Sequence, residues 1–258
     1  ALHCVYLYDE IKAKRLDGFV PRTVLIGGKA APGYFMAKLI IKFINNIAGM
    51  INGDPATEGK LRVYFVPDYR VTVAEHLMPA ADLSEQISTA GTEASGTGNM
   101  KFSLNGALTI GTMDGANIEI CEEVGEDNIF IFGMKTEEVE QLRGRGYNPW
   151  EFYNRIGALK SIIDRIRSGF FSPGEPDLFK PIAGTLLEGG DRYMVLADFE
   201  SYVECQKRVA RLYQDQEAWA EKSILNVASM GKFSSDRTIS QYQTEIWNAP
   251  SVEVKLSR

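Results

Sequence analysis

Small and hydroxyl-bearing residues followed by a lysine make residues 91–101, Gly-Thr-Glu-Ala-Ser-Gly-Thr-Gly-Asn-Met-Lys, the most chemically suggestive stretch of the sequence. Residues 95–98 let the backbone approach a bound phosphate closely, and their N–H groups and hydroxyls can donate hydrogen bonds to it. Lys101 follows Thr97 at helical spacing, so its amine can lie one turn away on the same side and form a Schiff base. The same pattern also fits a glycine-rich turn followed by an ordinary solvated lysine, and spacing alone leaves both interpretations open.

A second glycine-containing run, residues 27–34, lies between a predicted strand and a predicted helix. Backbone amides at such a junction can receive an anion. The GxGxxG spacing of dinucleotide sites is absent, and the nearest acidic residue after the next strand, Asp68, lies in a Pro-Asp-Tyr-Arg turn that need not face a ribose. A tight turn that uses glycines for backbone geometry explains this run equally well.

The supply of histidine and cysteine argues against metal chemistry. The sequence has two histidines, His3 and His76, and neither CxxC nor HExxH spacing, so we predict no metal site. The three cysteines, Cys4, Cys121 and Cys205, are widely spaced. An odd number of scattered cysteines favours reduced thiols in a cytoplasmic protein over a disulfide framework.

Length and charge limit the classes of protein further. At 258 residues, 45% of them hydrophobic, the chain can bury a sizeable core as one domain. With a net charge of -6, the chain has no excess of positive charge to attract nucleic acids or anionic membrane surfaces, so neither partner is expected. No apolar run reaches the length of about 18 residues that a membrane-spanning helix needs.

The elements that position these motifs alternate between strands and helices. Residues 23–26, 36–47 and 61–66 predict a strand, a helix and a second strand that together form a βαβ unit. Residues 107–110, 128–132 and 193–197 read as further strands, and the first dozen residues as the end of a helix. Further helices are expected at residues 136–144, 150–168, 198–213, 215–229 and 236–247. The fold class predicted is α/β: a doubly wound, mainly parallel, Rossmann-like sheet with a helical C-terminal tail.

Residues 82–101 resemble, almost letter for letter, the cofactor-binding signature of the glycogen and starch (α-glucan) phosphorylases. The resemblance extends through residues 26–34, 104–117, 169–173 and 231–239, so it covers essentially the whole chain. It implies the C-terminal half of a GT-B-type glycosyltransferase, with residues 1–258 as the domain that carries pyridoxal 5′-phosphate. The chain begins Ala-Leu-His-Cys without a methionine, and we expect the N-terminal domain of the enzyme to be absent from it.

The resemblance also implies a role for individual residues. Lys101 would hold pyridoxal phosphate as a Schiff base, and Lys101 and Thr97 would be the catalytic residues. Residues that would bind the cofactor are Gly96, Thr97, Gly98, Tyr69, Arg70 and Gln86, with Lys101. Residues that would bind the glucosyl unit are Glu93, Ala94, Ser95 and Gly96. Tyr34 matches an aromatic residue at the mouth of the catalytic cleft, although it could equally pack at the start of a helix.

The activity implied is phosphorolysis of an α-1,4-glucan such as glycogen, starch or a maltodextrin. Inorganic phosphate would remove the terminal glucose as α-D-glucose 1-phosphate. In this family the cofactor's own phosphate acts on the substrate phosphate, and its second pKa near 6 suits that role. The basic residues that hold both phosphates come largely from a segment upstream of this chain. We therefore expect little or no phosphorolysis from these residues alone. The resemblance also implies a homodimer when the enzyme is full length.

Three other functions remain as alternatives to this reading. Gly27, Gly28 and Gly33 would suit an oxidoreductase that binds a nicotinamide across the βαβ unit. A non-catalytic module could use the helical tail to dock a partner protein. An aminotransferase-like enzyme would also use a Schiff-base lysine, but nothing in the sequence identifies the Asp or Arg that such chemistry places near the pyridine nitrogen.

Overall fold

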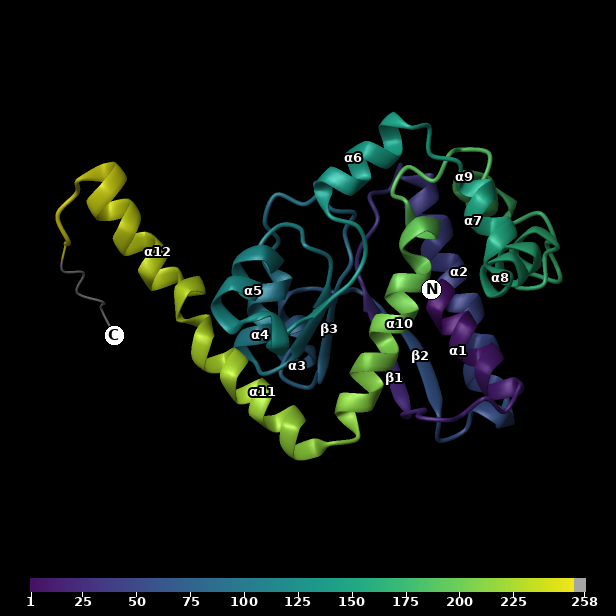
Figure 1. The fold of residues 1–258 in the computed structure, drawn as a ribbon, viewed down its shortest axis with the longest axis horizontal. Helices are drawn as coiled ribbons and strands as arrows, with labels where there is room; N and C mark the ends of the chain where they lie inside the picture. The colour runs from purple at the N-terminus through teal and green to yellow at the C-terminus, as the bar shows by residue number, and fades with distance from the viewer. Residues whose placement is uncertain (253–258) are drawn as a thin grey trace.

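The computed structural model of the protein describes residues 1–252, as α-helices packed around short parallel strands (Figure 1). The strands are β1 (Arg22–Gly27), β2 (Leu61–Val66), β3 (Leu83–Gln86), β4 (Leu108–Gly111) and β5 (Phe130–Ile131). The helices are α1 (Leu2–Lys12), α2 (Phe35–Gly53), α3 (Val71–Leu77), α4 (Gly98–Leu104), α5 (Asn117–Val124), α6 (Thr136–Gly144), α7 (Pro149–Arg155), α8 (Gly157–Arg167), α9 (Lys180–Leu186), α10 (Val195–Tyr213), α11 (Gln216–Ser229) and α12 (Ser235–Gln241).

The first sheet is the predicted βαβ unit. β1 and β2 pair in parallel from Arg22 with Leu61 to Gly27 with Val66, and α2 makes the crossover between them. The inner face of α2 is buried because apolar residues such as Phe43 and Ile47 recur at helical spacing. Phe43 packs edge-on against Phe171 and Phe179, with ring centroids 5.4 and 5.1 Å apart. This cluster anchors the largest core of the molecule, which α1, α8 and α9 complete.

The second sheet holds three strands in the order β3-β4-β5, again all parallel. β4 is buried at every position, as expected of a central strand that is covered on both faces. The α/β class, the parallel pairing and the helical tail therefore agree with the sequence prediction. The described strands nevertheless form two hydrogen-bonded sheets, whereas a single sheet was expected.

One long helix joins the two sheets. The first half of α10 contributes Leu196, Phe199 and Val203 to the core beside β1 and β2. Its second half contributes Cys205 and Val209 to the core beside β4. In Figure 1 α10 accordingly runs between the two sheets. All three cysteines are buried and free, as the sequence predicted.

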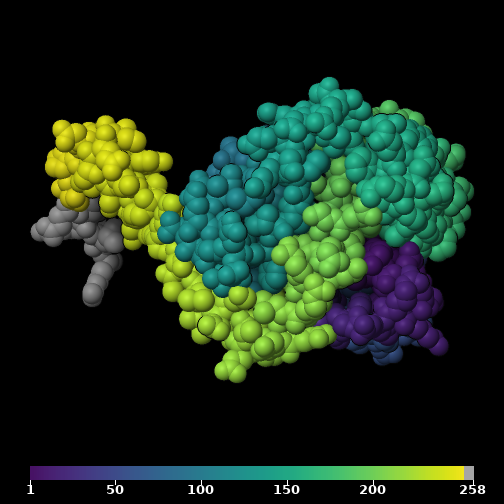
Figure 2. Space-filling model, in the orientation of Figure 1, coloured from purple at the N-terminus to yellow at the C-terminus, as the bar shows by residue number. Residues whose placement is uncertain are grey.

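The C-terminal helices extend away from this body. α11 lies beside β4, and a 3-10 turn at residues 230–233 connects it to α12. Figures 1 and 2 show α12 extending away from the rest of the molecule. Apolar side chains at this end of the molecule, including Ile239, Ile246 and Trp247, are exposed. Within residues 1–252 no helix has the combination of length and apolar character needed to cross a bilayer.

Some of the predicted elements were wrong in type or extent. Residues 193–197 do not form a strand: Tyr193 and Met194 lie in the turn before α10, and residues 195–197 begin that helix, whose start is supported by a hydrogen bond from the Leu196 N–H to the Asp191 carboxylate at 2.8 Å. The helix expected over residues 150–168 breaks at Ile156, whose backbone is extended, into α7 and α8. The strand expected over residues 128–132 shortens to β5.

Candidate functional site

Two loops meet at the carboxyl ends of β3 and β4. The first, residues 87–97, connects β3 to α4, and the second, residues 112–116, connects β4 to α5. The strands pair up to Gln86 with Gly111, and the Thr112 N–H then donates to the Gln86 carbonyl at 3.2 Å. Because the strands are parallel, both loops leave the same edge of the sheet, where open α/β sheets bind their ligands.

The second loop holds the first half of the first loop through a buried carboxylate. Asp114 is 4% exposed and accepts hydrogen bonds from the Ser88 hydroxyl at 2.6 Å, the Gly91 N–H at 2.9 Å and the Glu93 N–H at 3.0 Å. Hydrogen bonds to an ionised acceptor are stronger than neutral ones. The path of the backbone from Ser88 to Glu93 is therefore fixed by one side chain that lies beneath it.

The second half of the first loop is held by backbone contact and by two asparagines. The Ala116 N–H donates to the Ser95 carbonyl at 2.7 Å. Asn99 is buried and its amide donates to Asn117 Oδ1 at 3.0 Å and to the Ser95 carbonyl at 3.3 Å. The Asn117 amide in turn donates to the carbonyls of Thr112 at 3.0 Å and Gln86 at 3.3 Å. The turn that leads into α4 is thereby tied to the ends of β3 and β4.

Buried polar groups concentrate in this region. The described part of the chain buries thirteen polar or charged residues, and eight of them lie between residues 84 and 117. Burying a polar group is costly unless its hydrogen bonds are made, and a fully bonded network is rigid. This concentration of buried, hydrogen-bonded polar groups indicates a site whose geometry is fixed before any ligand binds.

Backbone donors are left free where the loop turns into α4. Among residues 1–252 no acceptor is assigned to the N–H groups of Gly96, Thr97 and Gly98. Gly96 has φ +81°, a left-handed conformation that glycine adopts without strain. Gln86 approaches the same turn, because a side-chain carbon added at Gly98 would lie 3.7 Å from its Nε2. These N–H groups can receive an oxyanion.

Lys101 lies one turn along α4, as its spacing predicted. Its own N–H donates to the Thr97 carbonyl at 3.2 Å, so the two residues occupy successive turns. Lys101 is exposed, and its amine makes no hydrogen bond or ion pair with the described residues. Glu93, Ala94 and Ser95 are exposed on the same loop. The loop therefore presents its amine and its free backbone donors at the surface.

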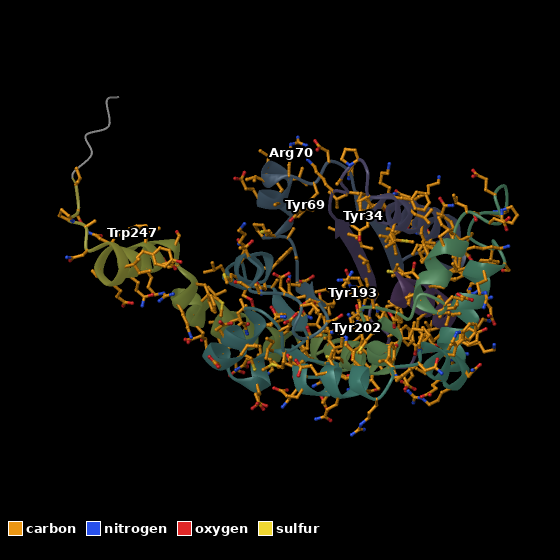
Figure 3. All side chains as sticks on the ribbon, turned by 90° about the horizontal axis from the view of Figure 1, so that it is seen from above. Tyr34, Tyr69, Arg70, Tyr193, Tyr202 and Trp247 are labelled. Carbon is orange, nitrogen blue, oxygen red and sulfur yellow. The ribbon has the colours of Figure 1, made fainter. Side chains whose placement is uncertain are left out.

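Tyr69 and Arg70 lie in a separate group after β2. The Tyr69 ring covers the end of β1, since a side-chain carbon at Gly27 would lie 2.8 Å from Tyr69 Cδ2. The Asp68 carboxylate bridges the Arg70 guanidinium at 2.5 Å and the Lys29 amine at 2.8 Å. The hydrogen bond from Lys29 holds the pKa of Asp68 below its ordinary value. Figure 3 shows Tyr69 and Arg70 close together, with Tyr34 on the same upper side and Trp247 far away.

The structure thus brings most, but not all, of the predicted site residues together. Residues 93–98, Gln86 and Lys101 share the edge of the β3-β4 sheet, whereas Tyr69, Arg70 and Tyr34 belong to the β1-β2 unit. No hydrogen bond or ion pair within residues 1–252 joins the two groups. Two surface hollows lie elsewhere, one lined by Arg167 and Lys180 and the other by Lys160 and Asp164. The loop residues Glu93, Ala94 and Ser95 and the Lys101 side chain are exposed.

A third segment supports the loop from behind. The Thr89 hydroxyl donates to the Tyr193 carbonyl at 2.6 Å, which ties the loop to the turn before α10. Asp191 in that turn is 2% exposed and accepts from the Tyr147 hydroxyl at 2.9 Å. Burial raises the pKa of the Asp191 carboxyl above its ordinary value. This carboxyl lacks a cationic partner among the described ion pairs.

The fold and the loop are those of a known family. A family model described as carbohydrate phosphorylase matches residues 1–249, and the chain belongs to that family. It is 60% identical over 246 residues to the muscle form of glycogen phosphorylase of Bos taurus, which covers 95% of this chain and 29% of the relative. It is 58% identical over 255 residues to glycogen phosphorylase of a Synechocystis strain and 56% identical over 255 residues to the mouse brain form. The chain spans about 30% of the length of these relatives.

Sequence reasoning did not single out the residues that shape the loop. Asp114 and Asn117 stand in a Thr-Met-Asp-Gly-Ala-Asn run that was noted only for its resemblance to the family. The Asp-Gly pair is a turn signal, and polar residues directly after a mostly apolar strand are a second signal. Together they could have indicated a turn that meets the neighbouring loop. Their partners, Ser88 and Asn99, carry no sequence signal that would have paired them with this turn.

Proposed function

We propose that this chain is the C-terminal, pyridoxal-phosphate-binding domain of a cytoplasmic α-glucan phosphorylase. The enzyme would transfer the terminal glucose of an α-1,4-glucan to inorganic phosphate and release α-D-glucose 1-phosphate. The family match and the identity of about 60% to enzymes named glycogen phosphorylase support the reaction. The observation that carries the site is the turn at residues 96–98, whose backbone donors are free, with the Lys101 amine one helical turn later.

The residues present suit pyridoxal phosphate. The cofactor needs donors for a phosphate and an amine for its aldehyde, and residues 96–98 and Lys101 offer both within two successive helical turns. Gly96 and Gly98 leave the backbone uncovered, so a phosphate oxygen can approach the N–H groups closely. Within residues 1–252 the Lys101 amine has no hydrogen-bond or ion-pair partner that it would have to give up. When bound, pyridoxal phosphate supplies a phosphate group that can give or take a proton near neutral pH.

The residues of this chain would bind the cofactor and orient its phosphate. The N–H groups of Gly96, Thr97 and Gly98 would hold the cofactor phosphate, with the Thr97 hydroxyl beside it. Gln86, Tyr69 and Arg70 would line the cofactor pocket, with the Arg70 guanidinium providing positive charge next to two phosphates. This part of the proposal requires the Tyr69 group to face the loop across the edge of the two sheets.

The glucosyl unit would lie against the exposed part of the loop. The Glu93 carboxylate and backbone groups of Ala94 and Gly96 would pair with sugar hydroxyls, and Ser95 would offer its hydroxyl oxygen because its carbonyl already accepts from Ala116 and Asn99. The other wall of the cleft and the remaining basic groups would come from an N-terminal domain, and the complete enzyme would be a homodimer. We accordingly expect little or no phosphorolysis from the 258 residues alone.

Borohydride reduction tests the cofactor site directly. The chain is incubated with pyridoxal phosphate, reduced and digested, and the peptides are mapped by mass spectrometry. We expect the label on Lys101 and its loss in Lys101→Arg, because a guanidinium is not a nucleophilic amine. Lys38→Arg, at another exposed lysine, is the matched control and should leave the label unchanged. Labelling at another lysine in the unmodified chain would refute the site assignment.

A turnover assay tests the division of the enzyme. Glucose 1-phosphate formation from glycogen and phosphate is measured for the 258-residue chain with pyridoxal phosphate. Turnover comparable to that of a full-length phosphorylase would contradict the proposal that a second domain completes the cleft. Binding of NAD to the chain would instead favour the nicotinamide alternative.

A further inference from the structure

The loop that carries the proposed site has two halves, and different side chains hold each half. Asp114 bonds to Ser88, Gly91 and Glu93, all of which lie before Ala94. Asn99 donates to the Ser95 carbonyl in the second half and to Asn117 Oδ1 at the start of α5. The Asn117 N–H donates to the Asp114 carbonyl at 3.2 Å, but no side-chain hydrogen bond among residues 1–252 joins Asp114 to Asn99 or Asn117.

We propose that Asp114 and Asn99 are positioning residues for two separate ligand groups. Asp114 would set the half of the loop that presents Glu93 to the sugar, and Asn99, braced by Asn117, would set the half that presents the free N–H groups to the cofactor phosphate. This inference rests on the proposed function for the identity of the ligands. The division of the loop itself rests on the hydrogen bonds alone.

Burial makes each of these side chains hard to replace. Asp114 is 4% exposed, Asn99 3% and Asn117 2%, so water cannot substitute for a lost partner. Neither Asp114 nor Asn99 is among the residues that would touch sugar or cofactor, and each acts through the backbone it holds. The two halves join at residues 93–95, where the Ser95 N–H points to Glu93 Oε1 at 3.5 Å and a side-chain carbon added at Gly115 would meet both Ser95 and Glu93.

The geometry predicts what Asp114→Asn changes. Gly91 donates to Oδ1 and Glu93 to Oδ2, and an asparagine offers only one oxygen. At least one of these N–H groups must therefore lose its acceptor in either orientation of the amide. The loss of one buried, charge-assisted hydrogen bond should increase opening of the first half about tenfold or more. The second half keeps all of its bonds.

The geometry predicts a different change for Asn99→Ala. This substitution removes the donors to Asn117 Oδ1 and to the Ser95 carbonyl, and no other hydrogen bond to Asn117 Oδ1 is present within the described residues. Alanine favours the helix, so α4 itself should persist. We expect the pyridoxal phosphate concentration that half-labels Lys101 to rise about tenfold or more, because fewer molecules hold the phosphate turn in its binding conformation.

Hydrogen exchange with mass spectrometry and borohydride labelling of Lys101 are the two readouts, both on the 258-residue chain. D114N should speed exchange of amides in residues 88–93 and leave the labelling midpoint within about twofold. N99A should raise the labelling midpoint and leave exchange in residues 88–93 unchanged. The matched controls are D127N, at an exposed aspartate whose carboxylate makes no hydrogen bond or ion pair with residues 1–252, and N154A, at an exposed asparagine on α7. Both controls should behave as the unmodified chain.

A purely structural role gives another result. If D114N and N99A lose labelling and exchange protection together, in proportion to their loss of thermal stability, the proposal is wrong. Should N99A fail to fold, the unmodified chain still tests whether the loop is held in two halves. Pyridoxal phosphate should then slow hydrogen exchange in residues 95–101 and leave exchange in residues 88–93 unchanged. Equal protection of both halves would contradict the proposal. Absence of labelling at Lys101 in the unmodified chain would defeat the proposed function, whereas the exchange pattern of the two variants still decides whether the loop is held in two halves.

Discussion

Gly115 lies where the two loops of the site leave no room for a side chain, and its replacement by alanine should damage both. Its φ is +52°, in the left-handed region that side chains disfavour. A side-chain carbon there would lie 2.6 Å from the Ser95 carbonyl oxygen and 3.1 Å from Glu93 Cγ. The nearer obstacle is backbone, which cannot rotate away as the end of a flexible side chain could.

The expected cost combines two effects. A left-handed conformation costs a non-glycine residue about 1–2 kcal/mol. Forcing a methyl group into a filled space costs about 1–3 kcal/mol. Together they predict that Gly115→Ala lowers the free energy of unfolding by about 2–5 kcal/mol, and for a chain of this size each kcal/mol lowers the melting temperature by about 2–4 °C. Displacement of Ser95 would also stretch the 2.7 Å hydrogen bond from the Ala116 N–H.

Thermal unfolding followed by circular dichroism measures this cost. Gly28→Ala is the matched control, because nothing lies within 4 Å of a carbon added at Gly28 and its φ is outside the left-handed region. The control should melt with the unmodified chain. If Gly115→Ala also melts within about 1 °C of it, equivalent to the roughly 0.5 kcal/mol typical of a harmless surface change, then the two loops do not pack as closely as described.

Two further substitutions test the core and the turn behind the loop. Phe179→Ala leaves a cavity at a fully buried ring, so we expect the free energy of unfolding, measured by urea titration, to fall by about 3–5 kcal/mol. The control Phe35→Ala, at a ring that is 62% exposed, should change this free energy little. Equal losses in the two variants would contradict the described packing. Burial raises the folded-state pKa of Asp191 above the ordinary 3.8, so its contribution to stability is complete below the unfolded pKa and is lost as pH rises through the folded pKa. Asp191→Asn should therefore lose less stability than the unmodified chain as pH rises above 3.8, which melting temperatures measured against pH would show. Identical pH profiles would show that the pKa of this carboxyl is the same in the folded and unfolded states.

Periodicity predicted the elements whose burial is decided locally. β1, α2 and β2 follow from apolar runs at strand and helix spacing, and their parallel pairing follows from the crossover helix. β3 was missed because three of its four residues, Ser84, Glu85 and Gln86, are polar. Their partners come from far along the chain: Glu85 accepts hydrogen bonds from Tyr202 and Gln206 on α10. No local pattern carries that information.

The candidate site divides in the same way. The free N–H groups of residues 96–98 and the position of Lys101 depend on glycine placement and helical spacing, which the sequence displays directly. The supports of the loop depend on pairs such as Asp114 with Gly91 and Asn99 with Asn117, which form only when β3 and β4 pair in register. Motif reading therefore finds the groups that would touch a ligand more readily than the groups that hold them in place.

The separation of the two sheets gives α10 a direct influence on the site. Tyr69 and Arg70 follow β2, the Lys101 loop follows β3, and no backbone hydrogen bond joins these sheets among the described residues. Buried Gln206 joins them instead: its side chain and carbonyl accept from Arg22 at the start of β1, and its amide donates to Glu85 on β3 at 2.8 Å. A buried glutamine on α10 thus links the two sheets that carry the two groups of proposed cofactor residues, because side-chain bonds here take the place of a shared strand.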